Sequence, residues 1–440
     1  MTAPDATPNN PEPTPNVAEP VPNAAEPAPD GSEPTPNGAE PTQPARSAGT
    51  MNAVLVGLLG AIVALAFAHG RHTPYNNYVL LASQMLQGHL WIDPLWRDAS
   101  IDAVLFDGHR YIVNDPVPAI LILPLVALTG LYANQTLLAC LLCGVAVGAA
   151  WALLERIGVT RRVAIWLVVF FLAGTDLLWC SMLGDVWFIA QTSAVAFAML
   201  ALCELAGKRR GWLVAAWFAL ALGSRFTLVM ALPVILWWVW DGFLVPERRP
   251  RSARSFLLTL LPFFALWVAY NLARWHVPWD AGHTIFYHQD PYMGSVTGSP
   301  FGLANVPVEL FSFFIVAPAL HPQFPYIEPL VFGTALAFTS PALVLAFFAR
   351  EPRRLVVSLW AATLLVAGPS LLYYANGGSQ FGMRHALDFV PFVLVLMGLA
   401  ARSNLWPPIW RAGQVLIAWS ALAGLYGCWY WNTFLRPGML

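Results

Sequence analysis

The strongest constraint on the fold of this chain is a succession of long apolar stretches, separated by short charged turns, that begins at Met51. About twenty apolar residues are enough for a helix to cross a bilayer. Hydrophobic residues make up 58% of the chain, charged residues only 11%, and the mean hydropathy is +0.58, which is typical of polytopic membrane proteins. We predict an all-α membrane protein with eleven spans, at about 52–68, 134–154, 163–183, 187–206, 211–225, 226–245, 255–274, 329–349, 355–374, 385–401 and 413–432.

Arginine and lysine residues set the predicted orientation, because they accumulate in the cytoplasmic loops of membrane proteins. Alternate turns between the predicted spans are basic, namely 156–162, 208–210, 248–254, 350–354 and 402–411. These turns and the N-terminal tail are therefore predicted to be cytoplasmic, and two long loops, 69–133 and 275–328, then face outward. The apolar stretches Val117–Leu128 and Val306–Leu320 are predicted to lie along the interface, since a full crossing by either would reverse every later turn.

Residues 1–50 differ from the rest of the chain, because they include no aromatic residue and almost no large aliphatic one. Such a segment cannot bury enough apolar surface to offset the entropy that it would lose on ordering. Glutamate recurs every seven residues from Glu12 to Glu40, as in a coiled coil, but a proline in every unit excludes a continuous helix. We predict a disordered, proline-rich tail at 1–50, with a spacer or partner-binding role, followed by a membrane domain at 51–440.

Five cysteines lie in or beside the apolar stretches, and two of them, Cys140 and Cys143, have the spacing of a metal or redox motif. No second pair and no histidine stands near them, so we interpret all five as buried packing thiols. The sequence also carries no phosphate-binding loop, dinucleotide-binding fingerprint, nucleophile elbow or zinc-protease motif. The commonest soluble chemistries are therefore disfavoured, and neither a cofactor nor a nucleic-acid partner is expected.

The first outer loop is unusually acidic. It holds Asp93, Asp98, Asp102, Asp107 and Asp115. An aspartate at the rim of a low-dielectric cavity can act as a general base toward a hydroxyl. Asp93 and Asp102 follow apolar residues that would seat them at the membrane surface, whereas Asp107 precedes a glycine and favours a turn. Asp115, in an Asn-Asp-Pro turn just before an interfacial stretch, fits a turn and a catalytic role equally.

Two charged residues, Arg384 and Asp388, stand four positions apart near the outer end of a predicted span, where a helix would place them on one face. Charges inside a membrane are costly and therefore often functional, although such a pair also serves simply to fix helix packing. A guanidinium matches phosphate oxygens with two parallel hydrogen bonds, so Arg384 suits a lipid phosphate. Arg225, at another outer span end, suits the same role or else reaches to the interface.

The second outer loop and the span before it offer further polar and aromatic candidates. Asn271 follows Tyr270 at the end of a span, and the loop holds Asp280, His283, His288 and Asp290. Their spacing fits no familiar metal site, so a bound divalent metal is disfavoured. Aromatic residues such as Trp279 fit stacking on a sugar and anchoring at the headgroups equally. We interpret His283 and Asn271 as candidate substrate-binding residues.

These segments, taken in order, resemble the GT-C superfamily of polytopic glycosyltransferases, which includes protein O-mannosyltransferases and lipid A aminoarabinose transferases. The resemblance rests on the acidic first loop, Tyr111–Pro118 before an apolar stretch, Tyr270-Asn271 and Gln380–Pro391, and covers most of 51–402. It implies a polyprenyl-phosphate sugar donor, an acceptor on the outer face, a first-loop aspartate as base with inversion, and Tyr111 as a binding residue. The chain departs from the family in having no acid in Arg71–Tyr78.

The sequence therefore predicts an inverting glycosyltransferase of a bacterial-type inner membrane, with its site facing outward. In this hypothesis Asp102 or Asp93, with Asp115 as a third candidate, deprotonates a glycan, lipid or protein acceptor. Arg384 holds the departing polyprenyl phosphate, and Asp388 orients Arg384. A transporter or lipid flippase is the main alternative, but no internal repeat is found after residue 51. The second alternative is a non-catalytic scaffold whose tail recruits partners.

Overall fold

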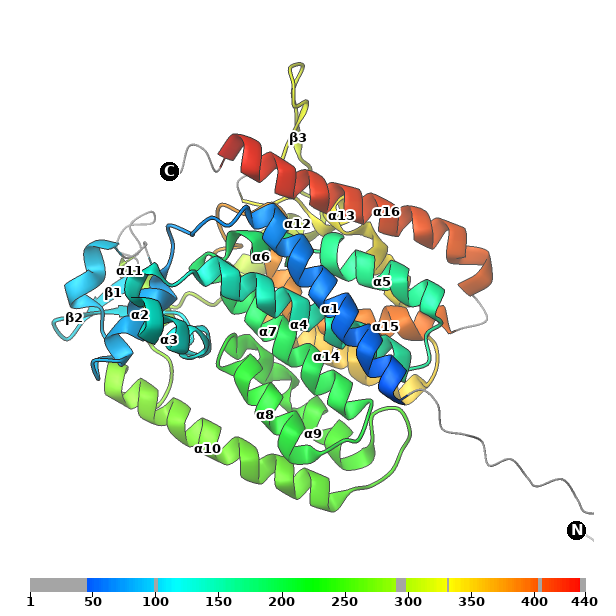
Figure 1. Cartoon of the computed structure of the whole chain (residues 1–440), viewed down its shortest axis with the longest axis horizontal. Helices are drawn as coiled ribbons and strands as arrows, with labels where there is room; N and C mark the ends of the chain where they lie inside the picture. The colour runs from blue at the N-terminus through cyan, green and yellow to red at the C-terminus, as the bar shows by residue number, and fades with distance from the viewer. Residues whose placement is uncertain (1–45, 99–101, 290–297, 331, 403–405, 436–440) are drawn as a thin grey trace, which may run out of the picture. The chain divides into compact units, whose positions relative to one another are not determined.

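The computed structural model describes residues 46–98, 102–289, 298–330, 332–402 and 406–435. The chain divides into two compact units, residues 1–44 and 45–440, and the fold described below is that of the second. Most of the predicted disordered tail lies outside the described residues, but its last five residues, 46–50, form the start of α1 (Arg46–Ala68), so the tail was predicted to extend too far. The described part is a bundle of apolar helices with two small hairpins, as expected for an all-α polytopic membrane protein (Figure 1).

Ten of the eleven predicted spans coincide with one helix or with two consecutive helices of the structure. Within the described ranges, five helices are long and apolar enough to cross a membrane alone, namely α1 (Arg46–Ala68), α4 (Gln135–Arg156), α7 (Val186–Leu205), α10 (Pro250–Trp275) and α14 (Arg353–Leu372). A sixth span forms if α5 (Arg161–Ala173) and α6 (Leu177–Leu183), bent by 46°, are taken together. The other predicted spans coincide with α8 (Gly211–Leu222), with η3 (Phe226–Ala231) and α9 (Leu232–Asp241), with η6 (Arg384–Asp388) and α15 (Val390–Ala401), and with α16 (Trp406–Tyr430).

The prediction of one continuous span at 329–349 was wrong. This stretch contains only a short turn of helix, α13 (Leu336–Thr339), followed by a 3-10 helix, η5 (Pro341–Phe348). Proline disfavours helical backbone in the residue before it, and Ser340 accordingly has φ −138° and ψ 46°. Hydropathy alone did not reveal this break, because every side chain around it is apolar or small.

Small residues allow α1 and α4 to pack closely, and the two helices lie side by side in Figure 1. A Cβ built on Gly57 would lie 2.8 Å from the carbonyl oxygen of Gly144, and one built on Gly148 would lie 2.8 Å from that of Ala53. Small residues four apart permit this approach of helix backbones in membranes, where the packing contacts themselves drive association. The first span is thereby fixed on the bundle, directly before the acidic loop.

The first outer loop folds into a small structured region. It contains α2 (Asn77–Met85), η1 (Asp93–Asp98), the antiparallel pair β1 (Ala103–Phe106) and β2 (His109–Ile112), α3 (Val117–Thr129) and η2 (Gly130–Tyr132). Asp107 and Gly108 both have positive φ and form a two-residue turn that matches the twist of the strands, as the sequence predicted. The Asp107 carboxylate, however, contacts His276 Nε2 at 3.0 Å.

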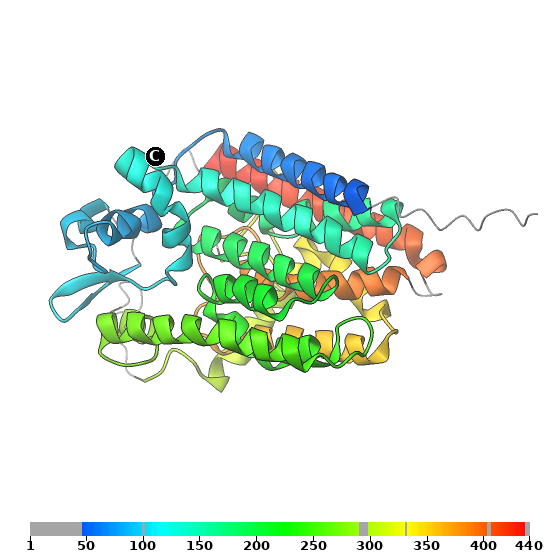
Figure 2. The same ribbon diagram turned by 60° about the horizontal axis from the view of Figure 1, so that its bottom comes forward.

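The second outer loop contains α11 (Gly282–Gln289), η4 (Leu303–Asn305), α12 (Val306–Phe314), β3 (Ala319–Leu320) and β4 (Ile327–Glu328). Both apolar stretches predicted to be interfacial begin as helices, α3 and α12, although the second ends at Phe314 instead of continuing to Leu320. Figure 2 shows β1 and β2 at the same end of the bundle as α2, α3 and the C-terminal end of α10. Loops far apart in sequence therefore meet at this end.

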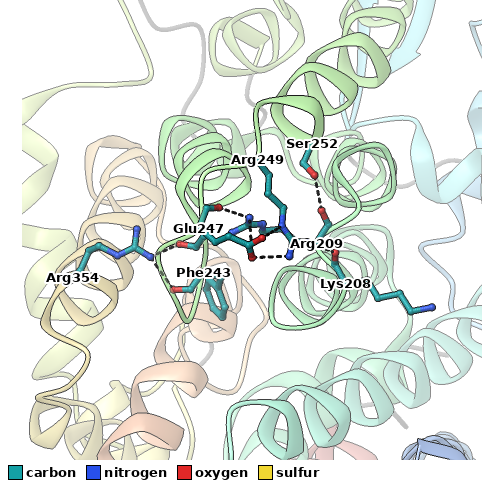
Figure 3. A network of polar contacts seen from close by, with 8 residues as sticks. Lys208, Arg209, Phe243, Glu247, Arg249, Ser252 and Arg354 are labelled. Atoms are coloured by element: carbon teal, nitrogen blue, oxygen red, sulfur yellow. Dashed lines mark hydrogen bonds and ion pairs between the residues drawn. The ribbon is translucent and has the colours of Figure 1, made fainter.

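The basic turns meet at the opposite ends of the same helices. Arg209 and Arg249 both pair with Glu247, as Figure 3 shows. Arg354 pairs with Asp241. The network joins the turns before α8, α10 and α14 (Figure 3). The structure thus separates a basic end of the bundle, defined here by these turns, from the end that holds the two long loops.

Candidate functional site

The centre of the charged site is an ion pair between two segments that are distant in sequence. Arg225, between α8 and η3, donates to both carboxylate oxygens of Asp388, at 3.3 Å from Nε and 2.9 Å from a terminal nitrogen. Thr227 Oγ1 donates to the same carboxylate at 2.9 Å. The Asp388 side chain is 1% exposed and that of Arg225 is 22% exposed. The pair therefore fixes the start of η3 against η6 in a largely desolvated setting.

The predicted pairing of Arg384 with Asp388 was wrong. These residues belong to a 3-10 helix with three residues per turn, so positions four apart do not share a face. The Arg384 guanidinium lies 5.2 Å above the Phe188 ring, and among the described residues it makes no hydrogen bond or ion pair. Asp102 and Asp388 lie near enough to act on it electrostatically. Arg384 is thus a buried cation with hydrogen-bonding capacity to spare.

Asp115 lies at the turn into α3, beside the same cluster. Its carboxylate accepts a hydrogen bond of 3.0 Å from the backbone N–H of Phe226, the residue after Arg225. Withdrawal from water and the nearby charge of Asp280 raise the pKa of Asp115 to about 6, against the opposing charges of His283 and Arg225. A carboxylate with this pKa is ionised at neutral pH and still able to accept a proton.

A second charged pair, Asp280 and His283, adjoins Asp115. Asp280 contacts His283 Nδ1 at 3.1 Å and accepts hydrogen bonds from Trp275 Nε1 at 3.1 Å and from the backbone N–H of Gly282 at 2.9 Å. Withdrawal from water alone would lower the pKa of His283, but the hydrogen bond and charge of Asp280 raise it overall. The imidazole therefore tends toward the cationic form near Asp115.

Asp102 lies behind this cluster, and its side chain is engaged with the bundle. It is 7% exposed and accepts a hydrogen bond from the indole N–H of Trp187, in the first turn of α7. The Trp187 ring packs against Tyr75, with ring centroids 5.0 Å apart. Asp102 thus connects the first loop to the end of α7 close to Arg384.

Three residues singled out from the sequence contact residues outside this cluster. Asp93 contacts His109 Nδ1 at 2.8 Å and accepts from the backbone N–H of Arg110 at 3.0 Å, which attaches η1 to the hairpin. Tyr111 is buried in a separate apolar cluster with Trp275. Asn271 donates to the carbonyl of Trp267 in its own helix, at 3.0 Å. Their contacts are structural ones within the outer region.

Sequence reasoning missed two polar residues at the site, Asp176 and His385. Asp176 lies at the break between α5 and α6, and a Cβ built on Gly382 would lie 2.5 Å from its carboxylate. His385 Nδ1 accepts from Arg225 at 3.2 Å, because a guanidinium can only donate. A lone aspartate within an apolar stretch was the available signal for Asp176, since ionisable residues in such stretches are often functional.

The cysteine prediction was confirmed, because all five cysteines are free and buried. Within the described ranges, no group of three His, Cys, Asp or Glu side chains is placed to hold a metal ion. The cluster that does form, defined here as the charged site, consists of Asp102, Asp115, Asp176, Arg225, Asp280, His283, Arg384, His385 and Asp388. It combines carboxylates with an unpaired guanidinium at the end of the bundle opposite the basic turns.

Fold and site together define a polytopic α-helical membrane protein with a charged site at one end of its bundle. No family model and no curated protein matches the chain. The chain is similar to the structure of ArnT from Cupriavidus metallidurans bound to undecaprenyl phosphate, with 14% identity, a TM-score of 0.46, and coverage of 87% of this chain and 76% of that one. It is also similar to the apo oligosaccharyltransferase of Archaeoglobus fulgidus, with 12% identity, a TM-score of 0.43 and coverage of 88%, but it spans only 55% of that protein.

Proposed function

We propose that this protein is a GT-C glycosyltransferase that transfers a sugar from a polyprenyl-phosphate donor to an acceptor hydroxyl. The observation that carries the proposal is the placing of Asp115 and the unpaired Arg384 in one charged site. Such a transfer needs a base for the acceptor and a cation for the phosphate that leaves. Undecaprenyl phosphate, the ligand of the ArnT structure, belongs to the class of lipid that we propose as the leaving group here.

Asp115 is the base that the geometry favours among the first-loop aspartates. Asp93 is engaged with His109, and Asp102 accepts from Trp187 inside the fold. Asp115 accepts one backbone hydrogen bond, and withdrawal from water raises its pKa to about 6. A base is most effective when its pKa lies near the working pH.

In the proposed reaction, Asp115 takes the proton of the acceptor hydroxyl while the oxygen attacks the anomeric carbon of the sugar. The new carbon–oxygen bond forms on the face opposite the phosphate, and the bond from the anomeric carbon to the phosphate oxygen breaks, with inversion. The lipid phosphate leaves with the electron pair, and its charge is bound by Arg384 with Arg225 nearby. Asp388 acts as a positioning residue that holds Arg225, in place of the role toward Arg384 that the sequence predicted.

We further propose that the charged site faces the non-cytoplasmic side of an inner membrane. The basic turns before α8, α10 and α14 gather at the other end of the bundle, and basic turns mark the cytoplasmic side. The proline-rich tail would then be cytoplasmic. No cofactor is required by this reaction, and chelation of divalent cations is expected to leave transfer unchanged.

The test incubates purified full-length protein with a panel of radiolabelled polyprenyl-phosphate sugars. Transfer of the label to an acceptor, or slow hydrolysis of the donor, is measured. Asp115→Asn is expected to lower transfer by about a hundredfold or more, the usual contribution of a general base. Asp93→Asn is the matched control in the same loop and is expected to retain activity. Wild-type activity in Asp115→Asn, or loss in Asp93→Asn alone, would contradict the assignment of the base.

One observation favours a second function, that of a transporter or lipid flippase. The pair α5 and α6 is a broken helix bent by 46°, with Asp176 at the break, and broken helices with charges form the binding sites of many transporters. Proteoliposomes with a fluorescent or radiolabelled lipid-linked sugar discriminate between the two functions. A transporter moves the intact lipid across the bilayer, whereas the enzyme cleaves the sugar from the phosphate.

A further inference from the structure

Two apolar grooves flank α9 at the basic end of the bundle, away from the charged site. The first, of about 610 Å³, lies between α9 and α10 and is lined by Leu236, Trp240, Ala253, Arg254, Leu257 and Leu258. The second, of about 620 Å³, lies between α9 and α14 and is lined by Val234, Arg353, Arg354, Val357, Ser358 and Ala361. Pro233 and Trp237 line both grooves, so the two are adjacent and share one wall.

The grooves lie on either side of α9, which follows directly on η3. The ten residues of α9 extend over about 15 Å, roughly half the thickness of a bilayer core. Long helices stand on both sides of it, α10 with 26 residues and α14 with 20. The side chains that border the gaps are exposed and apolar, including Trp240 at 44%, Leu258 at 59% and Val357 at 60% exposure. Hydrocarbon chains, and not water, suit such walls.

Each groove also presents a cation at its basic end. Arg254 borders the first groove from the first turns of α10, and Arg353 borders the second from the first residue of α14. Neither side chain forms an ion pair within the described ranges, and both are exposed. Arg354, by contrast, is held by Asp241 and lies 4.7 Å above the Trp237 ring, so it forms part of the wall.

We propose that each of the two grooves beside Trp237 binds an anionic phospholipid of the leaflet at the basic end, with its acyl chains against α9 and its phosphate at the arginine that borders that groove, Arg254 in the first and Arg353 in the second. Basic pockets between membrane helices on the cytoplasmic side are characteristic binding sites of anionic lipid headgroups. Tryptophan side chains at the same depth suit the headgroup boundary. These two grooves are distinct from the charged site, because they lie at the other end of the bundle and share no residue with it.

The test is photolabelling of the purified full-length protein in mixed micelles with phosphatidylglycerol or phosphatidylcholine that carry the same diazirine acyl chain, followed by mapping of labelled peptides. We expect phosphatidylglycerol to label α9 and the facing parts of α10 and α14 in preference to phosphatidylcholine. The double variant Arg254→Gln, Arg353→Gln is expected to reduce the preference by about fivefold for each arginine removed, the usual contribution of a basic residue at an anionic surface.

The control variant is Arg251→Gln, Arg411→Gln, which removes two exposed arginines that border neither groove and is expected to keep the preference. Sugar transfer serves as a separate readout, because the double groove variant leaves the charged site intact. Equal labelling by the two lipids, labelling confined to other helices, or an unchanged preference in the groove variant would overturn the proposal. If none of the polyprenyl-phosphate sugars is transferred, the proposed glycosyltransferase activity is contradicted, whereas the lipid site at α9 is decided by the photolabelling.

Discussion

Substitution of Asp115 by asparagine tests the proposed base most directly, because the structure gives a magnitude for its pH dependence. With a pKa of about 6, roughly one tenth of Asp115 is ionised at pH 5 and roughly nine tenths at pH 7. If the ionised form is the base, the transfer rate of the wild-type protein should rise about tenfold over this interval. The pH profile of kcat/KM for a polyprenyl-phosphate sugar measures this rise. In Asp115→Asn the residual transfer rate should no longer rise with pH over this interval.

The same substitution separates a catalytic role from a structural one. The native state favours protonated Asp115, so the free energy of unfolding of the wild-type protein falls as pH rises from 3.8 to about 6. At neutral pH this charge costs at most about 3 kcal/mol, and asparagine removes it. The Tm of Asp115→Asn in detergent at pH 7 should therefore equal or exceed that of the wild type. A lower Tm of the variant would refute the reasoning. So would a transfer rate that still rises between pH 5 and pH 7 in the variant.

Three further outcomes follow from the contacts of the charged site. Asp388→Asn leaves Arg225 without its counter-ion and should destabilise the fold by about 3 kcal/mol, which is measured as a lower Tm. The double variant Asp388→Asn, Arg225→Gln should recover part of this loss, because it also removes the unpaired charge. Arg384→Gln should raise KM for the lipid-phosphate donor about tenfold or more, and Arg384→Lys less, because a charged hydrogen bond to phosphate is lost. Deletion of residues 1–44 should leave kcat unchanged in the transfer assay, whereas a scaffold would lose its partners.

Hydropathy was sufficient to predict the position of most helices, because the bilayer demands a run of apolar residues whatever the packing. It was insufficient at 329–349, where Pro341 ends the preceding helical turn without any change in hydropathy. The turn at Asp107-Gly108 was predictable for a local reason, since positive φ favours these residue types. Features set by neighbouring residues were thus accessible from the sequence.

The charged site was only partly predictable, because its contacts join distant segments. Asp102, Asp115, Arg225 and Arg384 were recognisable as charges near span ends, and the structure brings them together. The partner of Asp388 was not recognisable, since it stands 163 positions earlier and no local spacing indicates it. From the sequence, Asp93 and Asp102 were equivalent candidates, but in the structure the hairpin places His109 in contact with Asp93. Tertiary pairing, and not residue type, decides which aspartate stays available.

The ion pair between Arg225 and Asp388 has a consequence for the synthesis of the chain. Ribosomes make Arg225 well before Asp388, so the growing polypeptide must carry a membrane-embedded guanidinium through several insertion steps before its counter-ion is translated. A chain that ends before η6 keeps the Arg225 guanidinium without this counter-ion. The charged site is therefore complete only after the C-terminal part of the chain has been made.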